Sequence, residues 1–232
     1  NLVKKVGKPK VEGDHYPIDW YIKSNTPITL TCTDLGPHPV DDVTLYYRDY
    51  LIGDPAPGYT AVPGGYVEIQ KIEDSEHVLE FYCEDALGNT EGTAENPHVE
   101  IDIVDTQAPV SQKILGDPKH ECTENEAMMY YETPIPADGC YFITQNTPIT
   151  LTCTDGEPHP VDHVKIFYRD YLVGDCPPGF TEVDGDYVTF YKPQDSAHIL
   201  EWYCVDELGN TESTHVEYDI VDTEAPETTK KI

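Results

Sequence analysis

The chain carries the same sequence twice. Residues 25–90 run from NTPITLTCTD to DALGNT, and residues 146–211 run from NTPITLTCTD to DELGNT. The two stretches align without a gap, and about two thirds of the aligned residues are identical. Chance does not give identity at this level, so both copies must have one fold. The chain is therefore an array of modules rather than one larger domain.

The ends of the repeat predict the domain boundaries. We expect the first domain at residues 1–106 and the second at residues 107–224, each of ordinary size for a β-sandwich. The second copy is longer, and we place its extra residues in an inserted loop at about residues 120–139. Residues 225–232, APETTKKI, match APVSQKIL at residues 108–115, and they therefore predict the start of a further repeat.

Apolar and polar residues alternate along several short segments of each copy. In residues 28–32, Ile, Leu and Cys alternate with Thr, and residues 77–83 show the same period of two. In residues 98–104 the apolar residues alternate with Glu100 and Asp102, which predicts that these two acids face water. Antiparallel sandwich sheets typically have one face exposed to solvent and one face packed on the core.

Further strands are expected at about residues 20–23, 43–50 and 66–70, and turn-rich stretches such as GDPAPG separate them. The chain shows no helical periodicity. The predicted fold class is all-β, with two tandem immunoglobulin-like antiparallel β-sandwich domains.

Four of the seven cysteines recur in the repeat. Cys32 and Cys83 of the first copy correspond to Cys153 and Cys204 of the second, at the same spacing. Each lies on the apolar face of its strand, so we expect one bond across the two sheets of each copy, as in immunoglobulin domains. Such bonds persist outside the cell, which predicts a secreted, extracellular protein.

The remaining cysteines, Cys122, Cys140 and Cys176, belong to the second copy alone. We favour a Cys122–Cys140 bond that clamps the inserted loop, and Cys140–Cys176 is the competing pair. The thiol that is left over is expected to be buried and inert, although a link to another subunit is the alternative.

The charge balance excludes several partners. The chain has 14 basic and 44 acidic residues and a formal net charge of −30. Nucleic acid and anionic membranes would repel such a surface. No stretch approaches the roughly 20 apolar residues that a membrane-spanning helix needs, so we expect no membrane insertion.

Four strings of the sequence carry a resemblance. NTPITLTCTD, YYRDYL, EFYCEDALGNTE and VDTQAP resemble the immunoglobulin-like repeats of archaeal and bacterial cell-surface proteins, which include S-layer, adhesin and filament proteins. The resemblance covers both copies and implies a cell-surface location. Such modules are stalks, spacers and lattice elements, so the resemblance implies little about activity.

Motifs for catalysis are missing from the sequence. It has no GxSxG, HExxH or P-loop motif, and we expect no enzyme activity. The nine histidines include pairs at corresponding positions of the two copies, and we favour a structural role at strand ends over a metal-binding or catalytic one. These pairs are His38 with His159, His77 with His198, and His98 with His215.

Calcium is a possible ligand, because it binds six to eight oxygens from carboxylates, Asn side chains and carbonyls. Acidic and amide side chains recur just past the strand ends and at the VDTQAP junction, although Asp and Asn are also ordinary turn residues. The candidate metal ligands are Asp34, Asp85, Asn89, Asp105, Asp155, Asp206, Asn210 and Asp222.

The sequence leaves two function classes open. One is a structural surface protein that joins copies of itself head to tail into a filament or S-layer-like array. The residues expected to make that contact are Asn1, Leu2, Val3, Thr228, Thr229, Lys230, Lys231 and Ile232.

The alternative is an adhesin or carbohydrate-binding segment of a larger surface protein. It would expose an aromatic and acidic patch, which we expect in the insertion of the second copy. Tyr46, Tyr47, Tyr50 and Tyr171 could also stack on a sugar, although we favour these tyrosines as cross-strand partners in the sheets.

Overall fold

The computed structural model describes residues 1–13, 16–36, 39–40, 42–156, 161 and 163–231. The chain divides into two compact units. Module 1 comprises Asn1–Gln107, and module 2 comprises Ala108–Gly156 and Asp162–Ile232.

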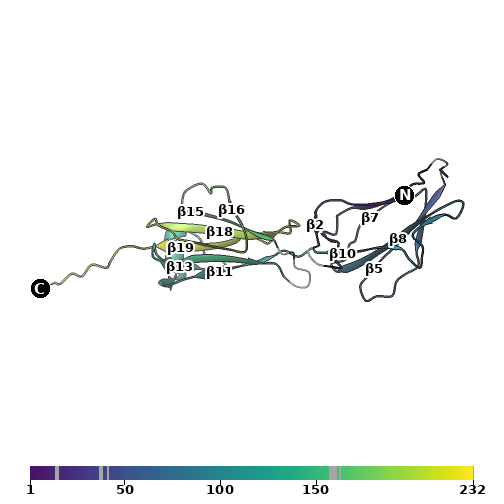
Figure 1. Ribbon diagram of the computed structural model, residues 1–232. Coiled ribbons are helices and arrows are strands. Elements are labelled where there is room, and N and C mark those ends of the chain that lie inside the picture. Colours follow the sequence, from purple (N-terminus) through teal and green to yellow (C-terminus); the bar gives the residue numbers. More distant parts are fainter. Residues whose placement is uncertain (14–15, 37–38, 41, 157–160, 162, 232) are drawn as a thin grey trace. The chain divides into compact units, whose positions relative to one another are not determined.

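Module 1 is a sandwich of two sheets (Figure 1). One sheet has the order β1-β4-β7, and the other has the order β2-β3-β10-β8-β5-β6, with β9 paired to β8. Its neighbouring strands are antiparallel except β3 and β10, which are parallel. The strands are β1 (Leu2–Val6), β2 (Lys10–Glu12), β3 (Trp20–Ile22), β4 (Ile28–Cys32), β5 (Val43–Leu51), β6 (Thr60–Pro63), β7 (Tyr66–Ile69), β8 (Glu76–Asp85), β9 (Thr90–Glu91) and β10 (His98–Val104).

Module 2 repeats this arrangement (Figure 1). Its sheets have the orders β11-β14-β17 and β12-β13-β19-β18-β15-β16, and β13 and β19 are the parallel pair. The elements are β11 (Val110–Leu115), β12 (Lys119–Glu121), α1 (Glu124–Tyr131), β13 (Cys140–Ile143), β14 (Ile149–Thr154), β15 (Val164–Leu172), β16 (Thr181–Asp184), β17 (Tyr187–Phe190), β18 (Ala197–Asp206) and β19 (His215–Val221).

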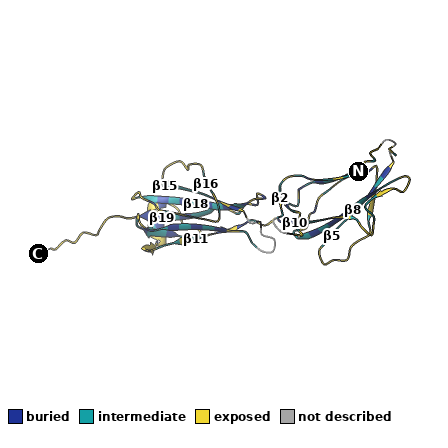
Figure 2. Ribbon diagram, viewed as in Figure 1, coloured by how far each residue is buried: buried dark blue, intermediate teal, exposed yellow. Residues whose placement is uncertain are grey.

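The core of each module fills the space between its two sheets. In β18, buried and partly exposed residues alternate along all ten positions, which is the period of two that a strand with one inner face requires (Figure 2). Ile28 and Leu30 of one sheet pack with Leu45 and Leu79 of the other. The two modules are therefore tandem immunoglobulin-like β-sandwich domains, as the sequence predicts.

Disulfides join strands of opposite sheets. Cys32 of β4 is bonded to Cys83 of β8, with Cα atoms 6.1 Å apart. Module 2 has the same bond between Cys153 and Cys204, with a Cα separation of 6.2 Å. Because each bond joins the middle strand of one sheet to a central strand of the other, it holds the two layers together.

The cysteines that belong to the second copy alone pair as the sequence analysis favours. Cys122 is bonded to Cys140, with Cα atoms 5.2 Å apart. Cys176 is a free thiol on the surface, so the expectation that it is buried was wrong. It follows the turn after β15, in a stretch where residues 173–179 are all exposed.

Strand β10 corrects the expected orientation of its acids. Asp102 is fully buried and Val99 is 58% exposed, so Glu100, Asp102 and Val104 face the core. In module 2, Glu217 and Asp219 are buried in the same way. An alternation with a period of two does not by itself say which face of the strand is exposed to water. The acids face inward here because buried lysines inside each sandwich bind their carboxylates.

The insertion of the second copy is not only a loop. Residues 124–131 form α1, which the sequence analysis did not predict. Thr123 caps the helix by accepting a hydrogen bond from Glu126 N, and the Glu126 side chain accepts one from Thr123 N. Ala127 and Tyr131 of α1 pack on Ile220 of β19, so the helix covers the outer face of the larger sheet.

Candidate functional site

A buried lysine binds two carboxylates inside module 2. Lys192 Nζ lies 2.7 Å from Asp170 of β15 and 2.7 Å from Asp219 of β19, and Lys192 is 1% exposed. Asp170 also contacts His198 Nδ1 at 2.8 Å. The other ring nitrogen of His198 lies 2.9 Å from the Gln194 carbonyl oxygen.

Module 1 repeats the cluster at every position. Lys71 Nζ lies 2.9 Å from Asp102 and 3.1 Å from Asp49, and the Lys71 side chain is fully buried. His77 Nδ1 lies 2.9 Å from Asp49, and its Nε2 lies 2.9 Å from the Glu73 carbonyl oxygen. We call these two sets the buried ion clusters.

Burial and charge act in opposite directions on the outer carboxylate of each cluster. Desolvation by burial alone would raise the pKa of Asp49 and of Asp170. The hydrogen bond from the histidine and the nearby lysine charge outweigh it and hold the pKa of each below its ordinary value. The carboxylates of Asp49 and Asp170 are therefore ionised near neutral pH.

A second lysine extends each cluster toward the first strand of its module. Lys113 of β11 contacts Glu217 of β19, and its Nζ lies 3.8 Å from Asp219. In module 1, Lys4 of β1 contacts Glu100 of β10. Asp219 therefore lies between Lys113 and Lys192, and charges connect the two sheets across the core.

We did not predict these lysines and the inward acids from the sequence, although a signal was present. Lys4, Lys71, Glu100 and Asp102 all have a counterpart of the same type in the second copy. Alternating charges kept in both copies of a strand are the pattern that could have identified a buried polar row.

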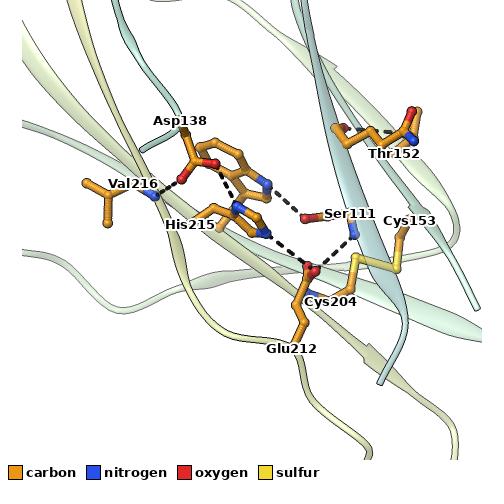
Figure 3. A network of polar contacts seen from close by, with 10 residues as sticks. Ser111, Asp138, Thr152, Cys153, Cys204, Glu212, His215 and Val216 are labelled. Carbon is orange, nitrogen blue, oxygen red and sulfur yellow. Dashed lines mark hydrogen bonds and ion pairs between the residues drawn. A yellow bond between two sulfur atoms is a disulfide. The ribbon is translucent and has the colours of Figure 1, made fainter. Parts of the chain in front are cut away.

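A polar network surrounds His215 in module 2 (Figure 3). Asp138 accepts hydrogen bonds from His215 Nδ1 at 2.8 Å and from Val216 N at 2.9 Å. His215 Nε2 lies 3.5 Å from Glu212, which also accepts from Ser111 N at 3.0 Å. Trp202 donates to Ser111 Oγ at 3.0 Å, so Ser111 belongs to the same network through both its backbone and its side chain.

The charges around His215 shift its titration. Burial alone would lower the pKa of His215, but the hydrogen bond to Asp138 and the charge of Glu212 raise it above its ordinary value. The network borders a pocket of about 250 Å³ that Lys113, Tyr141 and Glu217 also line. The pocket is polar and opens beside the Lys113–Glu217 contact.

The tyrosines of module 1 make contacts between neighbouring strands and with the adjacent loop. Tyr46 stacks on Tyr82 of the neighbouring strand, with ring centroids 4.7 Å apart. Tyr50 and Tyr59 both donate hydrogen bonds to Glu80, at 2.7 and 2.8 Å. These contacts are the cross-strand role that the sequence analysis favoured over a sugar-stacking platform.

The candidate metal ligands lie at opposite ends of each module. Asp34, Asp85 and Asn89 line one pocket of about 140 Å³ at the end of module 1 where β4 and β8 finish. Asp105 follows β10, which runs antiparallel to β8, and therefore lies at the other end. In module 2, ligand atoms of Asp155 and Asp206 lie within 4.8 Å of each other.

Local hydrogen bonds explain why these residues recur. Asp85 Oδ1 accepts from the backbone of Leu87 and Asn89, and its Oδ2 accepts from the Asn89 side chain at 2.7 Å. Asn210 donates to Asp206 in the same way. Asp34 accepts from Val40 N, Asp155 from Gly156 N, Asp105 from Gln107 N and Asp222 from Glu224 N. Calcium binding stays a prediction.

The residues expected to join copies differ at the two ends. Leu2 and Val3 belong to β1 and pair with β4 of their own module, and the Asn1 amino group donates to the Thr33 carbonyl oxygen at 2.6 Å. Residues 228–231 (Thr228, Thr229, Lys230 and Lys231) are exposed and belong to no strand of the described chain, and Ile232 lies outside the described residues.

Two further sequence expectations concern histidines and membranes. His77 and His198 are satisfied strand-end residues, as expected, while His38 and His159 lie outside the described residues. Within the described ranges, no helix is both long and apolar enough to cross a membrane.

The strand topology defines the class of this protein, which is a tandem immunoglobulin-like β-sandwich. No protein-family model and no curated protein sequence matches the chain. These comparisons identify no family.

Matches to solved structures include two of low sequence identity. The FN1–FN3 domains of chicken CNTN1 match with a TM-score of 0.37 and 10% identity over 86% of this chain. The chain covers 65% of that structure, which is less than two thirds of its length. The fibronectin(III)-like modules of Clostridium thermocellum CbhA match with a TM-score of 0.39 and 13% identity, over 98% of this chain and 100% of theirs.

Proposed function

We propose that the chain is a structural protein of the cell surface, which joins copies of itself head to tail into a filament or S-layer-like array. The observation that carries the proposal is the repeated reinforcement of the sandwich. Each module holds its two sheets together with a core disulfide and with a buried ion cluster at corresponding positions. A stalk or lattice needs stable, repeated modules. This structural role does not require the protein to turn over a substrate.

The connection between modules supports the proposal. Strand β10 ends at Val104 and β11 begins at Val110, so residues 105–109 alone link the last strand of one module to the first strand of the next. A linker this short transmits force from one sandwich to the next with little slack. The disulfides fit the oxidising conditions outside the cell.

The tail gives a chemical route to head-to-tail contact. Residues 225–231 match the sequence that leads into β11, yet they are exposed and lie outside the sheets. A segment with the sequence of a first strand can add to a sheet edge of another copy through main-chain hydrogen bonds.

Sedimentation velocity over a range of protein concentrations tests this assembly. The full chain should sediment as growing oligomers as its concentration rises. The variant Thr228→Pro/Thr229→Pro should stay monomeric, because successive N–H groups of a strand point to opposite sides and both donors are lost. The matched control Thr228→Ser/Thr229→Ser should assemble like the parent. Equal assembly of the proline variant would exclude the tail as the contact.

A binding role is the second candidate, and one observation favours it. Helix α1 exposes Met128, Met129 and Tyr130, with exposed fractions of 50%, 73% and 41%. This apolar and aromatic patch lies in the insertion where the copies differ. A glycan array screened with the full chain and with Tyr130→Ala distinguishes the candidates, because an adhesin should bind a glycan that the variant loses.

A further inference from the structure

A lysine and a glutamate from opposite sheets are in contact inside each module. Lys4 lies on β1, the first strand, and Glu100 lies on β10, the last strand of module 1. The exposed fractions of these side chains are 10% and 13%. In module 2, Lys113 of β11 contacts Glu217 of β19, with side chains 6% and 3% exposed. The contact joins the first strand to the last strand in both modules.

Burial makes this contact costly as an ion pair. The Lys4 and Lys113 side chains and their glutamate partners are largely closed off from water. Buried charges are costly unless hydrogen bonds satisfy them. Desolvation by burial lowers the pKa of Lys4 and of Lys113 from 10.5 to about 8. Each lysine is therefore readily available as a neutral amine, which is the nucleophilic form.

A third group lies beside each pair. Asp219 Oδ1 is 3.8 Å from Lys113 Nζ, and its other oxygen is held by Lys192 at 2.7 Å. Asp219 is fully buried, as is Asp102, which Lys71 holds in module 1. A fixed carboxylate next to an attacking amine can accept its proton and return that proton to the leaving oxygen.

From these contacts we infer that each module closes an amide cross-link between its first and last strands, Lys4 to Glu100 and Lys113 to Glu217. The neutral amine attacks the side-chain carbonyl carbon of the protonated glutamate. One C–N bond forms, one C–O bond breaks, and the departing hydroxyl leaves as water after the neighbouring aspartate has relayed a proton. Ammonium and carboxylate become an amide and one water molecule, with no oxidant or reductant.

The position of the link gives it a mechanical consequence. Force on a tandem chain enters a module at its first strand and leaves at its last strand. A covalent bond from β1 to β10, or from β11 to β19, carries that force directly past the sandwich. The disulfides do not do this, because Cys32 and Cys153 lie on β4 and β14.

Intact mass spectrometry of the full chain, reduced and denatured, tests the inference. Two amides should lower the mass by about 36 Da from the sequence value, at about 18 Da for each water lost. Lys4→Arg and Lys113→Arg should each remove half of the deficit, because a guanidinium keeps the charge without being a comparable nucleophile. Lys5→Arg, the exposed neighbour on β1, is the matched control and should keep the full deficit.

Asp219→Asn tests the role of the aspartate. It leaves Lys113 and Glu217 in place, and it should abolish the deficit of module 2 while module 1 keeps its own. Circular dichroism of each variant establishes that the sheets still form. A variant with a native spectrum and both amides would refute the assigned role of Asp219.

Peptide mapping identifies the linked residues. Trypsin does not cut at an acylated lysine, so a branched peptide should join the segment around Lys113 to the segment around Glu217. A succinimide at an Asp-Gly step loses the same mass but gives only linear peptides. Three results would each overturn the inference. They are an intact mass equal to the sequence mass, a lower mass with linear peptides only, and a branched peptide that links Lys192 to Asp219.

Discussion

Replacement of the central lysine of module 2, Lys192→Met, is predicted to destabilise that module strongly. Methionine keeps most of the aliphatic stem, so the packing of the side chain changes little. The ammonium group is lost, and Asp219, which is fully buried, loses the cation 2.7 Å from its carboxylate. Asp170 loses the same partner but keeps its contact with His198.

The size of the effect follows from the burial of the charges. Removal of one partner from a buried ion pair costs about 3–5 kcal/mol, because the remaining charge is left without compensation. With the steep denaturant dependence usual for guanidinium chloride, a loss of this size lowers the midpoint of unfolding by about 1 M. A surface pair gives no such effect, so Lys165→Met, which breaks the exposed Lys165–Glu182 pair, is the control.

The two tryptophans make the assay specific for one module. Trp20 lies in module 1 and Trp202 lies in module 2, where it is 2% exposed. In a Trp20→Phe background, tryptophan fluorescence during a guanidinium titration reports the unfolding of module 2 alone. The double variant Lys192→Met/Asp219→Asn should be more stable than the sum of its single variants predicts. If Lys192→Met lowered the midpoint no more than Lys165→Met does, the reasoning about the buried ion clusters would be refuted.

Three further outcomes are expected. Cys122→Ala/Cys140→Ala should lower the stability of module 2 by about 3 kcal/mol in denaturant titrations, from the entropy of closing a short loop; an unchanged midpoint contradicts this. His215 should titrate above 6.5 by NMR, and Asp138→Asn should bring its pKa down; its protonated form stabilises the fold below pH 6.5, and that contribution is lost as pH rises through the raised pKa. If the acidic residues at the strand ends bind calcium, EDTA should lower the melting temperature and Ca²⁺ should restore it; an unchanged melting temperature contradicts calcium binding.

The repeat and the period of two were sufficient to predict the sandwich. Residues such as Ile28, Leu30 and Cys32 alternate with threonines, and burial follows that alternation in the structure. The cysteine pairing followed from the same pattern, because Cys32 and Cys83 both lie on inner faces. These predictions succeeded because each rests on local residue order.

The sequence reasoning failed where a long-range partner decides the outcome. Alternation in β10 predicted strands correctly, but it assigned Glu100 and Asp102 to solvent because nothing local reveals Lys4 and Lys71 on the inner side. Helix α1 was missed for a different reason. Its capping box, Thr123 with Glu126, was legible in the sequence, but the short segment was taken for a loop.

Electron microscopy of the full chain in negative stain tests the central claim most directly. The account predicts filaments or a regular lattice with a repeat along the array, and it predicts that Thr228→Pro/Thr229→Pro abolishes them. Monodisperse particles of the parent chain at every concentration tested would contradict a self-assembling structural role.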